Sequence, residues 1–197
     1  MRAIGLAKIL GFYAALFVVA LLALWRMGRL SSLAPAVDDW QGMGLAVGAG
    51  IGVGLVLVVL SRAFARYFGW AARLEGELRA VVGPLRRGEA LGVALLSGLG
   101  EEALFRGVLQ PTLGIVLTAS LFGVLHIGPN VRFLPWSLMA FVAGVVFGGL
   151  AAGTGSLLGP ILAHATVNFL NLRYLSAVEL KGELHLEPVG GEHVVGP

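Results

Sequence analysis

Two adjacent glutamates and an arginine interrupt an apolar stretch of this sequence, in the segment GLGEEALFRGVLQ. Glu102 and Arg106 are four residues apart, so on a helix they share a face and can pair, which lowers the cost of burying both charges. Glu101 is rotated by about 100° from its neighbour and leaves that face. The spacing therefore predicts that the arginine holds one glutamate while the other points into a cavity.

Two further apolar segments carry polar side chains of a kind that activates water. His126 follows Phe122 by four residues in FGVLH, and Asn168 follows His164 by four residues in HATVN. A carboxylate shielded from bulk water is a suitable general base, and a histidine can orient water, donate a proton or bind a metal. An amide can donate to a developing oxyanion. With Glu101, these groups predict a site for adding water to a peptide bond.

Simpler interpretations exist for each group taken alone. A glutamate–arginine pair within a span is often structural or part of an ion path, and a histidine at a helix end is often interfacial. His164 and Asn168 could also form a hydrogen-bonded pair between helices. Their occurrence with the other groups on three apolar segments of one small chain favours a shared site. Ser97 and Ser120 are interpreted as helix-packing residues, because neither has a suitably placed His or Lys partner.

The composition places these groups in a membrane. Of the 197 residues, 57% are hydrophobic and only 13% are charged, whereas soluble domains carry about 25% charged residues. The mean hydropathy is +0.89. The chain has no cysteine, which excludes disulfides, thiolate catalysis and cysteine-based zinc sites. We expect membrane lipids as partners and no nucleic acid, because no platform of aromatic and basic residues is present.

Six apolar segments are long enough, or nearly long enough, to cross a bilayer, which takes about 20 residues. They are residues 4–25, 42–64, 90–109, 112–127, 134–152 and 155–175. We therefore expect an all-α integral membrane protein with a bundle of about six transmembrane helices, the fourth of which starts at Pro111. Small residues four apart predict close packing of helices at Gly44, Gly48 and Gly52, at Gly50 and Gly54, and at Gly144 and Gly148.

The connection formed by residues 65–89 combines arginines with apolar residues at near-helical spacing. This pattern predicts a basic amphipathic helix at the membrane interface. Its arginines favour the cytoplasmic side, which places both termini in the cytoplasm, and the membrane is expected to be a bacterial inner membrane. The first span is interpreted as an uncleaved anchor rather than a signal peptide.

The chain divides by these criteria into four parts. Residues 1–64 form two N-terminal transmembrane helices, residues 65–89 form the interfacial connection, and residues 90–175 form a four-helix core that contains the polar motifs. Residues 176–197 are predicted to be a polar tail that either pairs briefly as strands or is disordered.

The motifs EExxxR at residues 101–106, FxxxH at 122–126 and HxxxN at 164–168 resemble, in this order, those of the CPBP family of intramembrane proteases. This family is also called the Abi or CAAX-protease family, and the resemblance covers about residues 85–175. It implies that Glu101 activates the water and that His126 positions or polarises it. It further implies that His164 and Asn168 complete the site, with the asparagine facing the oxyanion. Supporting roles fall to Glu102, Arg106 and Phe122.

The resemblance also implies an endopeptidase whose substrate is a membrane-associated protein or peptide. Family members trim residues behind a prenylated cysteine, and others are linked to protein sorting or to bacteriocin maturation and immunity. The family is commonly described as metal-dependent, and Glu101, His126 and His164 could hold zinc. We favour a glutamate-activated water and leave the metal open. The alternatives are a small transporter or proton-coupled carrier, and a non-catalytic scaffold or immunity protein.

Overall fold

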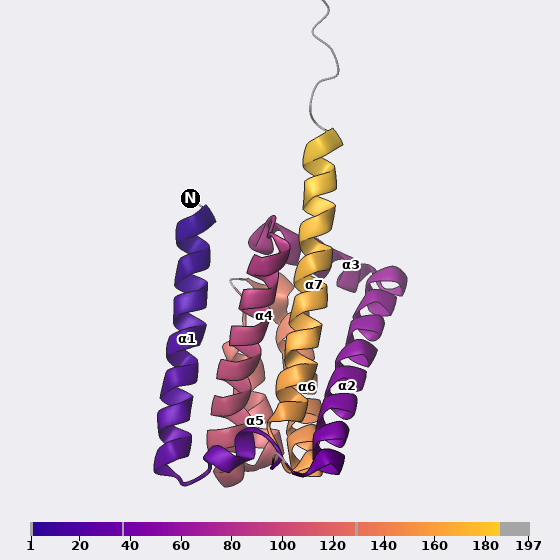
Figure 1. Ribbon diagram of the computed structural model, residues 1–197. Coiled ribbons are helices and arrows are strands. Elements are labelled where there is room, and N and C mark those ends of the chain that lie inside the picture. Colours follow the sequence, from indigo (N-terminus) through magenta and orange to yellow (C-terminus); the bar gives the residue numbers. More distant parts are fainter. Residues whose placement is uncertain (1, 37, 129, 186–197) are drawn as a thin grey trace, which may run out of the picture.

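The computed structural model of the chain describes residues 2–36, 38–128 and 130–185, with side chains between residues 5 and 177. Within these residues every regular element is a helix, and the helices form one bundle (Figure 1). Four helical segments are long and apolar enough to cross a membrane: Gly5–Arg26, Trp40–Tyr67, Arg87–Leu125 and Val131–Thr154. The predicted class, an all-α integral membrane protein, is therefore confirmed.

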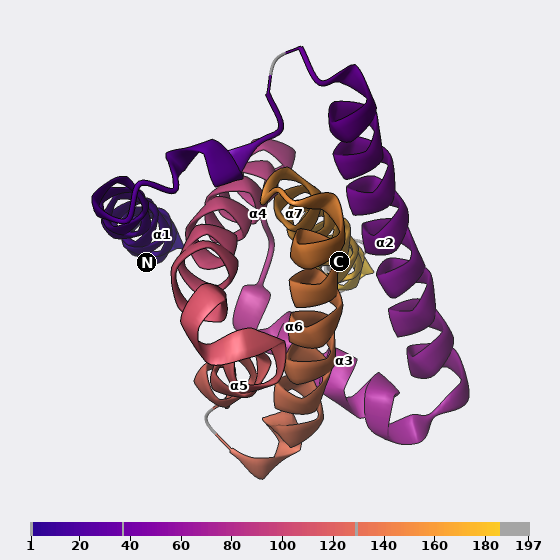
Figure 2. The ribbon, with the colours of Figure 1, turned by 90° about the horizontal axis from the view of Figure 1, so that it is seen from below.

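Two neighbouring helices, α4 (Arg87–Glu102) and α7 (Leu158–His185), form the middle of the bundle. On one side α1 (Arg2–Arg26) packs against α4, and on the other side α2 (Trp40–Tyr67) packs against α7 (Figure 2). The short helix η1 (Leu30–Leu33) lies in the connection between α1 and α2. The helices α4 and α7, which carry the two glutamates of EExxxR and the HxxxN motif, thus lie between the two N-terminal helices.

The third apolar segment is a helical hairpin rather than one straight span. From α4 the chain passes through a π-helical segment, η2 (Ala103–Leu109), into α5 (Gln110–Leu125). The backbone leaves helical geometry at Gly114, with φ 75° and ψ 172°, a region that essentially only glycine occupies. The chain reverses there, because His126 returns to within 3.8 Å of Glu101.

This reversal corrects the predicted boundary between the third and fourth spans. We predicted that Pro111 starts the fourth span, but the helical backbone continues through Pro111 and turns three residues later. After the turn, α5 packs against α6 (Leu134–Thr154), which follows the short helix η3 (Val131–Phe133). Proline at the start of a helix segment is compatible with helical geometry, whereas the reversal itself requires a positive φ.

The basic connection after α2 contains a helix, as predicted, but a shorter one. It is α3 (Gly69–Val82), because α2 continues to Tyr67 and α4 begins at Arg87. Extended backbone at Phe68 separates α2 from α3, and Gly83, with φ 62°, ends α3. The N-terminus, α3 and the end of α7 lie at the same end of the bundle (Figure 1). An even number of spans, such as the predicted six, places both termini on one side of the membrane. That this side is the cytoplasmic one stays a prediction.

Two further expectations need correction. Residues 176–185 continue α7 as a helix, where we predicted paired strands or disorder, and residues 186–197 lie outside the described residues. The glycine prediction holds at Gly50 and Gly54, which face α7, and at Gly144 and Gly148, which face α5 and η2. It was wrong for Gly44, Gly48 and Gly52, since no heavy atom among the described residues lies within 4 Å of their Cβ positions.

Candidate active site

The four residues predicted to do chemistry line one cavity of about 350 Å³. Glu101 comes from the end of α4, His126 directly follows α5, and His164 and Asn168 come from α7. The hairpin turn at Gly114 brings the first two together, and the packing of α4 on α7 adds the other two. The structure therefore brings together all four residues from three separate segments.

Glu101 presents the same carboxylate oxygen to both histidines. Its Oε2 atom lies 3.8 Å from Nε2 of His126 and 3.7 Å from Nε2 of His164. Oε2 is buried and has no hydrogen-bond partner among the described residues. These separations are too long for direct hydrogen bonds, but one water molecule can bridge groups at such distances. The three atoms thus frame a position for a water molecule.

The second ring nitrogen of each histidine is held by an acceptor. Nδ1 of His126 lies 2.7 Å from the carbonyl oxygen of Phe122, and Nδ1 of His164 lies 2.7 Å from Oε1 of Glu102. A carbonyl oxygen and a carboxylate accept hydrogen bonds, so each Nδ1 carries the proton. In the neutral form, each imidazole therefore turns an unprotonated Nε2 toward Glu101.

Glu102 and Arg106 form the buried ion pair that their spacing predicts. Nη1 of Arg106 lies 3.1 Å from Oε1 of Glu102, and neither side chain is exposed. Nη2 donates to the carbonyl oxygen of Gly144 on α6 at 3.2 Å. The same glutamate oxygen accepts from His164, so the ion pair also holds an imidazole of the site. Through these contacts, Glu102 and Arg106 hold the His164 side chain and the neighbouring helix α6 in place.

Aromatic rings form the wall behind the polar groups. Phe122 packs edge-on against Phe105, with ring centroids 5.0 Å apart, and its ring lies 4.3 Å from that of His126. The guanidinium carbon of Arg106 lies 4.6 Å from the Phe122 centroid. Phe122 thus contacts both a site histidine and the supporting arginine.

Ser97 belongs to the site, although we interpreted it as a packing residue. Nδ2 of Asn168 donates to Oγ of Ser97 at 2.9 Å, and this Oγ donates to the carbonyl oxygen of Ala94 at 3.2 Å. The serine therefore orients the asparagine amide. A signal was present in the sequence, because Ser97 precedes Glu101 by four residues and shares its helix face.

Two further residues of the site were not predicted. Tyr13 on α1 lines the cavity, and its hydroxyl lies next to the Glu101 carboxylate. Phe147 on α6 stacks on the His164 ring, with centroids 5.4 Å apart and planes inclined by 27°. Neither residue lies within the three motifs, and helical periodicity cannot relate α1 or α6 to α4.

The predicted metal ligands are neighbours but do not form a zinc site in this structure. Zinc binds oxygen and nitrogen at about 2.0–2.2 Å, which places tetrahedral ligand atoms roughly 3.3 Å apart. The two histidine nitrogens lie 3.7 and 3.8 Å from the Glu101 oxygen. Among the side chains that the structure describes, no group of three His, Asp or Glu has a metal-binding arrangement. Use of zinc stays a prediction.

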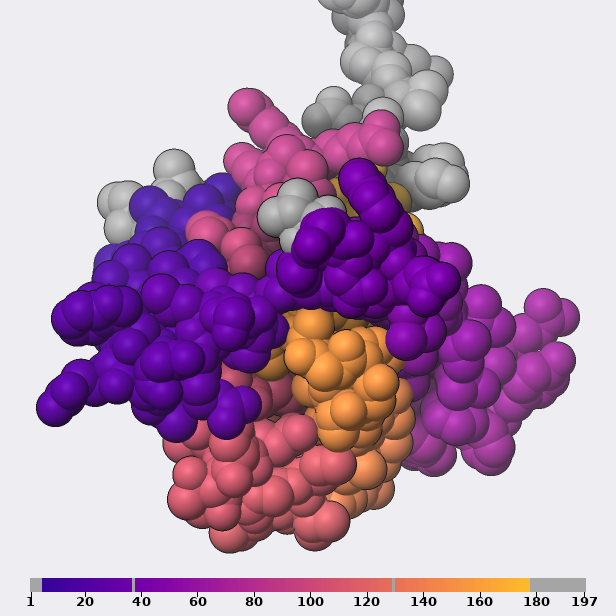
Figure 3. Space-filling model, turned by 60° about the horizontal axis from the view of Figure 1, so that its bottom comes forward, coloured from indigo at the N-terminus to yellow at the C-terminus, as the bar shows by residue number. Residues whose placement is uncertain are grey.

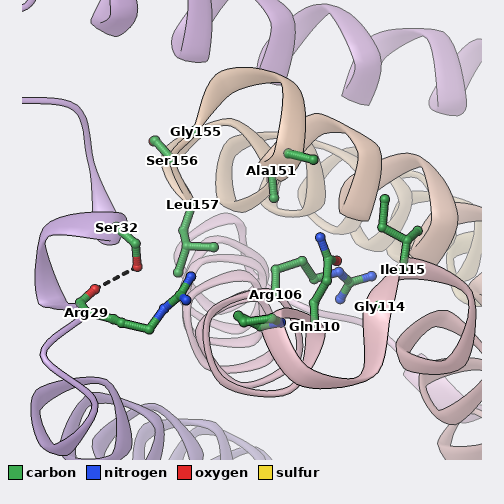
Figure 4. A pocket seen from close by; sticks show the side chains of 12 residues that line it. Arg29, Ser32, Arg106, Gln110, Gly114, Ile115, Ala151, Gly155, Ser156 and Leu157 are labelled. Carbon is green, nitrogen blue, oxygen red and sulfur yellow. Dashed lines mark hydrogen bonds between the residues drawn. The ribbon is translucent and has the colours of Figure 1, made fainter.

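A second recess, of about 330 Å³, lies where three connections of the chain meet (Figure 4). The connections follow α1, surround Gly114, and join α6 to α7, and their residues include Arg29, Ser32, Gln110 and Ser156. In Figure 3, the orange start of α7 is visible between the α1–α2 connection and α5 at this end of the molecule. None of the four predicted catalytic residues lines this recess, so we place the candidate site in the first cavity.

The fold and the site together define a multi-pass helical membrane protein with a glutamate, two histidines and an asparagine gathered in one cavity. Residues 86–170 match the family model of Type II CAAX prenyl endopeptidase Rce1-like proteins. All three motifs lie within the matched segment. The match confirms the resemblance to the CAAX-protease family, and it supports a protease as the general class.

The chain is also similar to a curated bacterial protein, Uncharacterized protein YpbD of Bacillus subtilis (strain 168). The two are 30% identical over 108 residues, which cover 53% of this chain and 55% of YpbD. The chain thus spans about half the length of this relative. No solved structure matches the chain.

Proposed function

We propose that this protein is an intramembrane endopeptidase in which Glu101 activates a water molecule to hydrolyse a peptide bond. The observation that supports it most is the position of the Glu101 Oε2 atom. It lies 3.8 Å from Nε2 of His126 and 3.7 Å from Nε2 of His164, and it has no hydrogen-bond partner among the described residues. A buried carboxylate oxygen without a partner is costly unless it binds something, and water is the reactant that hydrolysis needs.

In the first step, Glu101 takes a proton from the bridging water as the water oxygen bonds to the carbonyl carbon of the substrate. A histidine accepts the other hydrogen of this water through its unprotonated Nε2, and this hydrogen bond holds the water in line for attack. The orientation of the two histidines is secured by Phe122 and Glu102, which accept from Nδ1. The carbonyl π electrons move to oxygen, which becomes an oxyanion.

In the proposed mechanism, Asn168 stabilises that oxyanion. One hydrogen of its amide nitrogen goes to Oγ of Ser97, which leaves the other hydrogen for the substrate oxygen. The tetrahedral intermediate then collapses, and the bond between the carbonyl carbon and the leaving nitrogen breaks. The proton held by Glu101 passes to that nitrogen, so the carboxylate is regenerated and the products are a carboxylic acid and an amine.

The lining of the cavity supports a membrane-associated substrate. Apolar side chains from α2 and α6, such as Leu57, Phe64 and Met139, line it together with the polar site. A polypeptide that reaches the site from the lipid phase would keep apolar side chains out of water along this path. The process served by cleavage is one of those implied by the family: trimming of a C-terminal segment, protein sorting, or bacteriocin maturation and immunity.

The test is a comparison of membrane proteomes from cells that produce the wild type or Glu101→Gln. Glutamine keeps the size and much of the hydrogen bonding of glutamate but cannot take a proton, so cleavage should stop while the fold is retained. Glu77→Gln is the matched control, because Glu77 pairs with Arg132 outside the candidate site. This variant should cleave like the wild type. New protein termini that depend on Glu101 support the proposal. Full activity of purified Glu101→Gln on an identified substrate would refute it.

A proton-coupled carrier is the second candidate, and one observation favours it. Glu101, His164, Glu102 and Arg106 form a continuous row of ionisable groups, and Arg106 also lines the second recess. Such rows serve as proton paths in transporters. Reconstitution in vesicles with a pH-sensitive dye distinguishes the two functions. A carrier shows proton flux that Glu101→Gln abolishes, without cleavage of any membrane protein.

A further inference from the structure

The second recess, which the proposed mechanism does not use, contains an arginine without an acidic partner. Arg29 lines it, and Figure 4 shows the side chain extending from the connection after α1 toward Arg106 and Gln110. Its Nε atom is buried and has no hydrogen-bond partner among the described residues. None of their carboxylates forms an ion pair with it either. A buried charged donor without a partner is costly, which points to a ligand that the recess takes up.

The backbone that carries Arg29 is fixed by short hydrogen bonds. The carbonyl oxygen of Arg29 accepts from Oγ of Ser32 at 2.7 Å, and its N–H donates to the carbonyl oxygen of Leu24 at 2.8 Å. The carbonyl oxygen of Ser32 in turn accepts from the N–H of Leu157 at 2.7 Å, which ties the α1–α2 connection to the α6–α7 connection. Hydrogen-bonded backbone therefore forms two walls of the recess, and the arginine is attached to one of them.

The described residues that line the recess have an excess of positive charge. They include Arg29 and Arg106 but no carboxylate. Glu102 neutralises Arg106 from behind the wall, because it pairs with the guanidinium and does not line the recess. Neither Asp38 nor Asp39, the acidic residues of the α1–α2 connection, lines it. The charge of Arg29 is thus left over, and an anion with one negative charge would balance it.

Two more residues of the lining have a polar atom without a partner among the described residues. Nε of Arg106 is a donor, on a side chain that is only 3% exposed. Oε1 of Gln110 is an acceptor, because the amide nitrogen of this side chain donates to the carbonyl oxygen of Gly148 at 3.0 Å. Guanidinium donors suit the oxygens of a phosphate, whereas the amide oxygen needs a donor such as a hydroxyl. A phosphate ester with a hydroxyl near the phosphate matches both requirements.

The recess lies at a face of the membrane. The span Gly5–Arg26 ends, and the span Trp40–Tyr67 begins, at the two ends of the connection that carries Arg29. Trp25 and Trp40 are 67% and 79% exposed there, and exposed tryptophans prefer the level of the lipid headgroups. Figure 1 shows this connection at the end of the bundle opposite α3. Lipid phosphates are held at the same level, which favours a lipid over a soluble phosphate ester as the occupant.

We propose that the second recess binds the headgroup of an anionic phospholipid of the glycerophosphate type, in which a hydroxyl group accompanies the phosphate. Arg29 and Nε of Arg106 donate to the phosphate oxygens, and Oε1 of Gln110 accepts from the hydroxyl. The apolar part of the lining, which includes Ile115 and Leu157, receives the start of an acyl chain. This inference goes beyond the proposed function and does not depend on hydrolysis.

The test measures binding of four ligands to the purified, delipidated full-length protein in a neutral detergent, by native mass spectrometry and by the shift in unfolding temperature. Short-chain phosphatidylglycerol has acyl chains, phosphate and hydroxyls. Phosphatidylmethanol lacks the hydroxyls, diacylglycerol lacks the phosphate, and glycerol phosphate lacks the chains. We expect phosphatidylglycerol to bind about ten- to a hundredfold more tightly than diacylglycerol, the range of a charge-assisted hydrogen bond. It should bind about two- to tenfold more tightly than phosphatidylmethanol, the range of a neutral one.

The four ligands separate the parts of the proposal. Equal binding of the three lipids, or binding of none of them, would overturn it. Phosphatidylmethanol bound as tightly as phosphatidylglycerol would remove the hydroxyl contact to Gln110. Glycerol phosphate bound as tightly as phosphatidylglycerol would overturn the lipid as the occupant and assign the recess to a soluble phosphate ester.

Variants then assign the binding to the recess. Arg29→Gln should weaken binding of phosphatidylglycerol about ten- to a hundredfold. Arg26→Gln is the matched control, since Arg26 is exposed at the end of α1 and does not line the recess. Equal losses in the two variants would indicate unspecific attraction of the lipid and overturn the site.

A second pair of variants tests the site without removing Arg29. Ala152 is an exposed residue of the recess lining, so larger side chains fit there. Ala152→Glu and Ala152→Gln have the same size and differ in charge. Only the glutamate should weaken binding of phosphatidylglycerol, because its carboxylate repels the phosphate and can pair with Arg29 instead. Equal binding by both variants would overturn the anion site, even where Arg29→Gln fails to fold.

Discussion

Nδ1 of His164 lies 2.7 Å from Oε1 of Glu102, and the same oxygen lies 3.1 Å from Nη1 of Arg106. One buried carboxylate therefore serves both a histidine of the candidate site and an arginine that ties η2 to α6 through the carbonyl of Gly144. Glu102 therefore couples the orientation of the His164 imidazole to the packing of η2 on α6.

Arg106→Ala should lower the stability of the fold. It removes the cation from a fully buried carboxylate, and losing one partner of a buried pair costs roughly 3–5 kcal/mol. Thermal unfolding in detergent measures the effect. Arg132→Ala is the matched control, because the pair of Arg132 with Glu77 is largely exposed and such pairs contribute about 0–1 kcal/mol. A well-folded Arg106→Ala protein that has selectively lost turnover would instead give Arg106 a direct part in the reaction.

Asn168→Ala should slow cleavage without unfolding the protein. Loss of one oxyanion donor typically lowers kcat by about 10²–10³. Ser97→Ala should have a smaller effect in the same direction, since it frees the asparagine amide to rotate but leaves the donor in place. The measurements are kcat and KM on an identified substrate, with unfolding temperatures alongside. If Ser97→Ala has a lower kcat than Asn168→Ala, the serine contributes to the reaction by a route other than orienting the asparagine.

Gly114→Ala should destabilise the hairpin. A side chain at φ 75° and ψ 172° is strained by about 1–3 kcal/mol, although no other part of the described chain lies within 4 Å of the Cβ position. Gly48→Ala serves as the control, because that glycine is helical and its Cβ position is equally open. The unfolding temperature should fall for Gly114→Ala only. Equal unfolding temperatures for both variants would mean that the reversal at Gly114 is absent from the folded protein.

Removal of metal tests the alternative to a metal-independent glutamate mechanism. If Glu101, His126 and His164 bind zinc during turnover, a chelator should inactivate the wild type and added zinc should restore it. The metal content of the purified protein, measured in parallel, gives a readout that does not depend on activity. Activity that resists chelation in metal-free protein would agree with water activated by glutamate alone.

Helical periodicity was sufficient to predict the contacts made within one helix. The spacing of Glu102 and Arg106 predicted their ion pair, and the different helix faces of the two glutamates predicted that Glu101 lines a cavity instead. Ser97 could have been recognised by the same rule, because it shares a face with Glu101. Tyr13 could not, since its place beside the site depends on how α1 packs against α4, a long-range contact without a local pattern.

The position of the reversal was missed because two local signals compete there. Pro111 is the more familiar marker of a helix boundary, but a proline is accommodated where its missing N–H is not needed. The positive φ at Gly114 marks the point where the chain turns so that α5 can pack on α6, and that packing is a long-range contact without a local sequence pattern.

The prediction for the glycines of α2 was partly wrong for a related reason. Glycines four residues apart occur on two faces of this helix, and the spacing alone does not tell which of the two faces packs against α7.

The hairpin at Gly114 fixes how many residues can separate Glu101 from His126. Glu101 lies thirteen residues before the turn and His126 lies twelve residues after it, so the two arms are nearly equal. One residue inserted into a single arm would displace its active-site side chain by about 1.5 Å and rotate it by about 100°. Only insertions of about a full turn in both arms at once would keep the glutamate opposite the histidine. Functional relatives of this chain should therefore differ in the EExxxR-to-FxxxH distance by about seven residues or not at all.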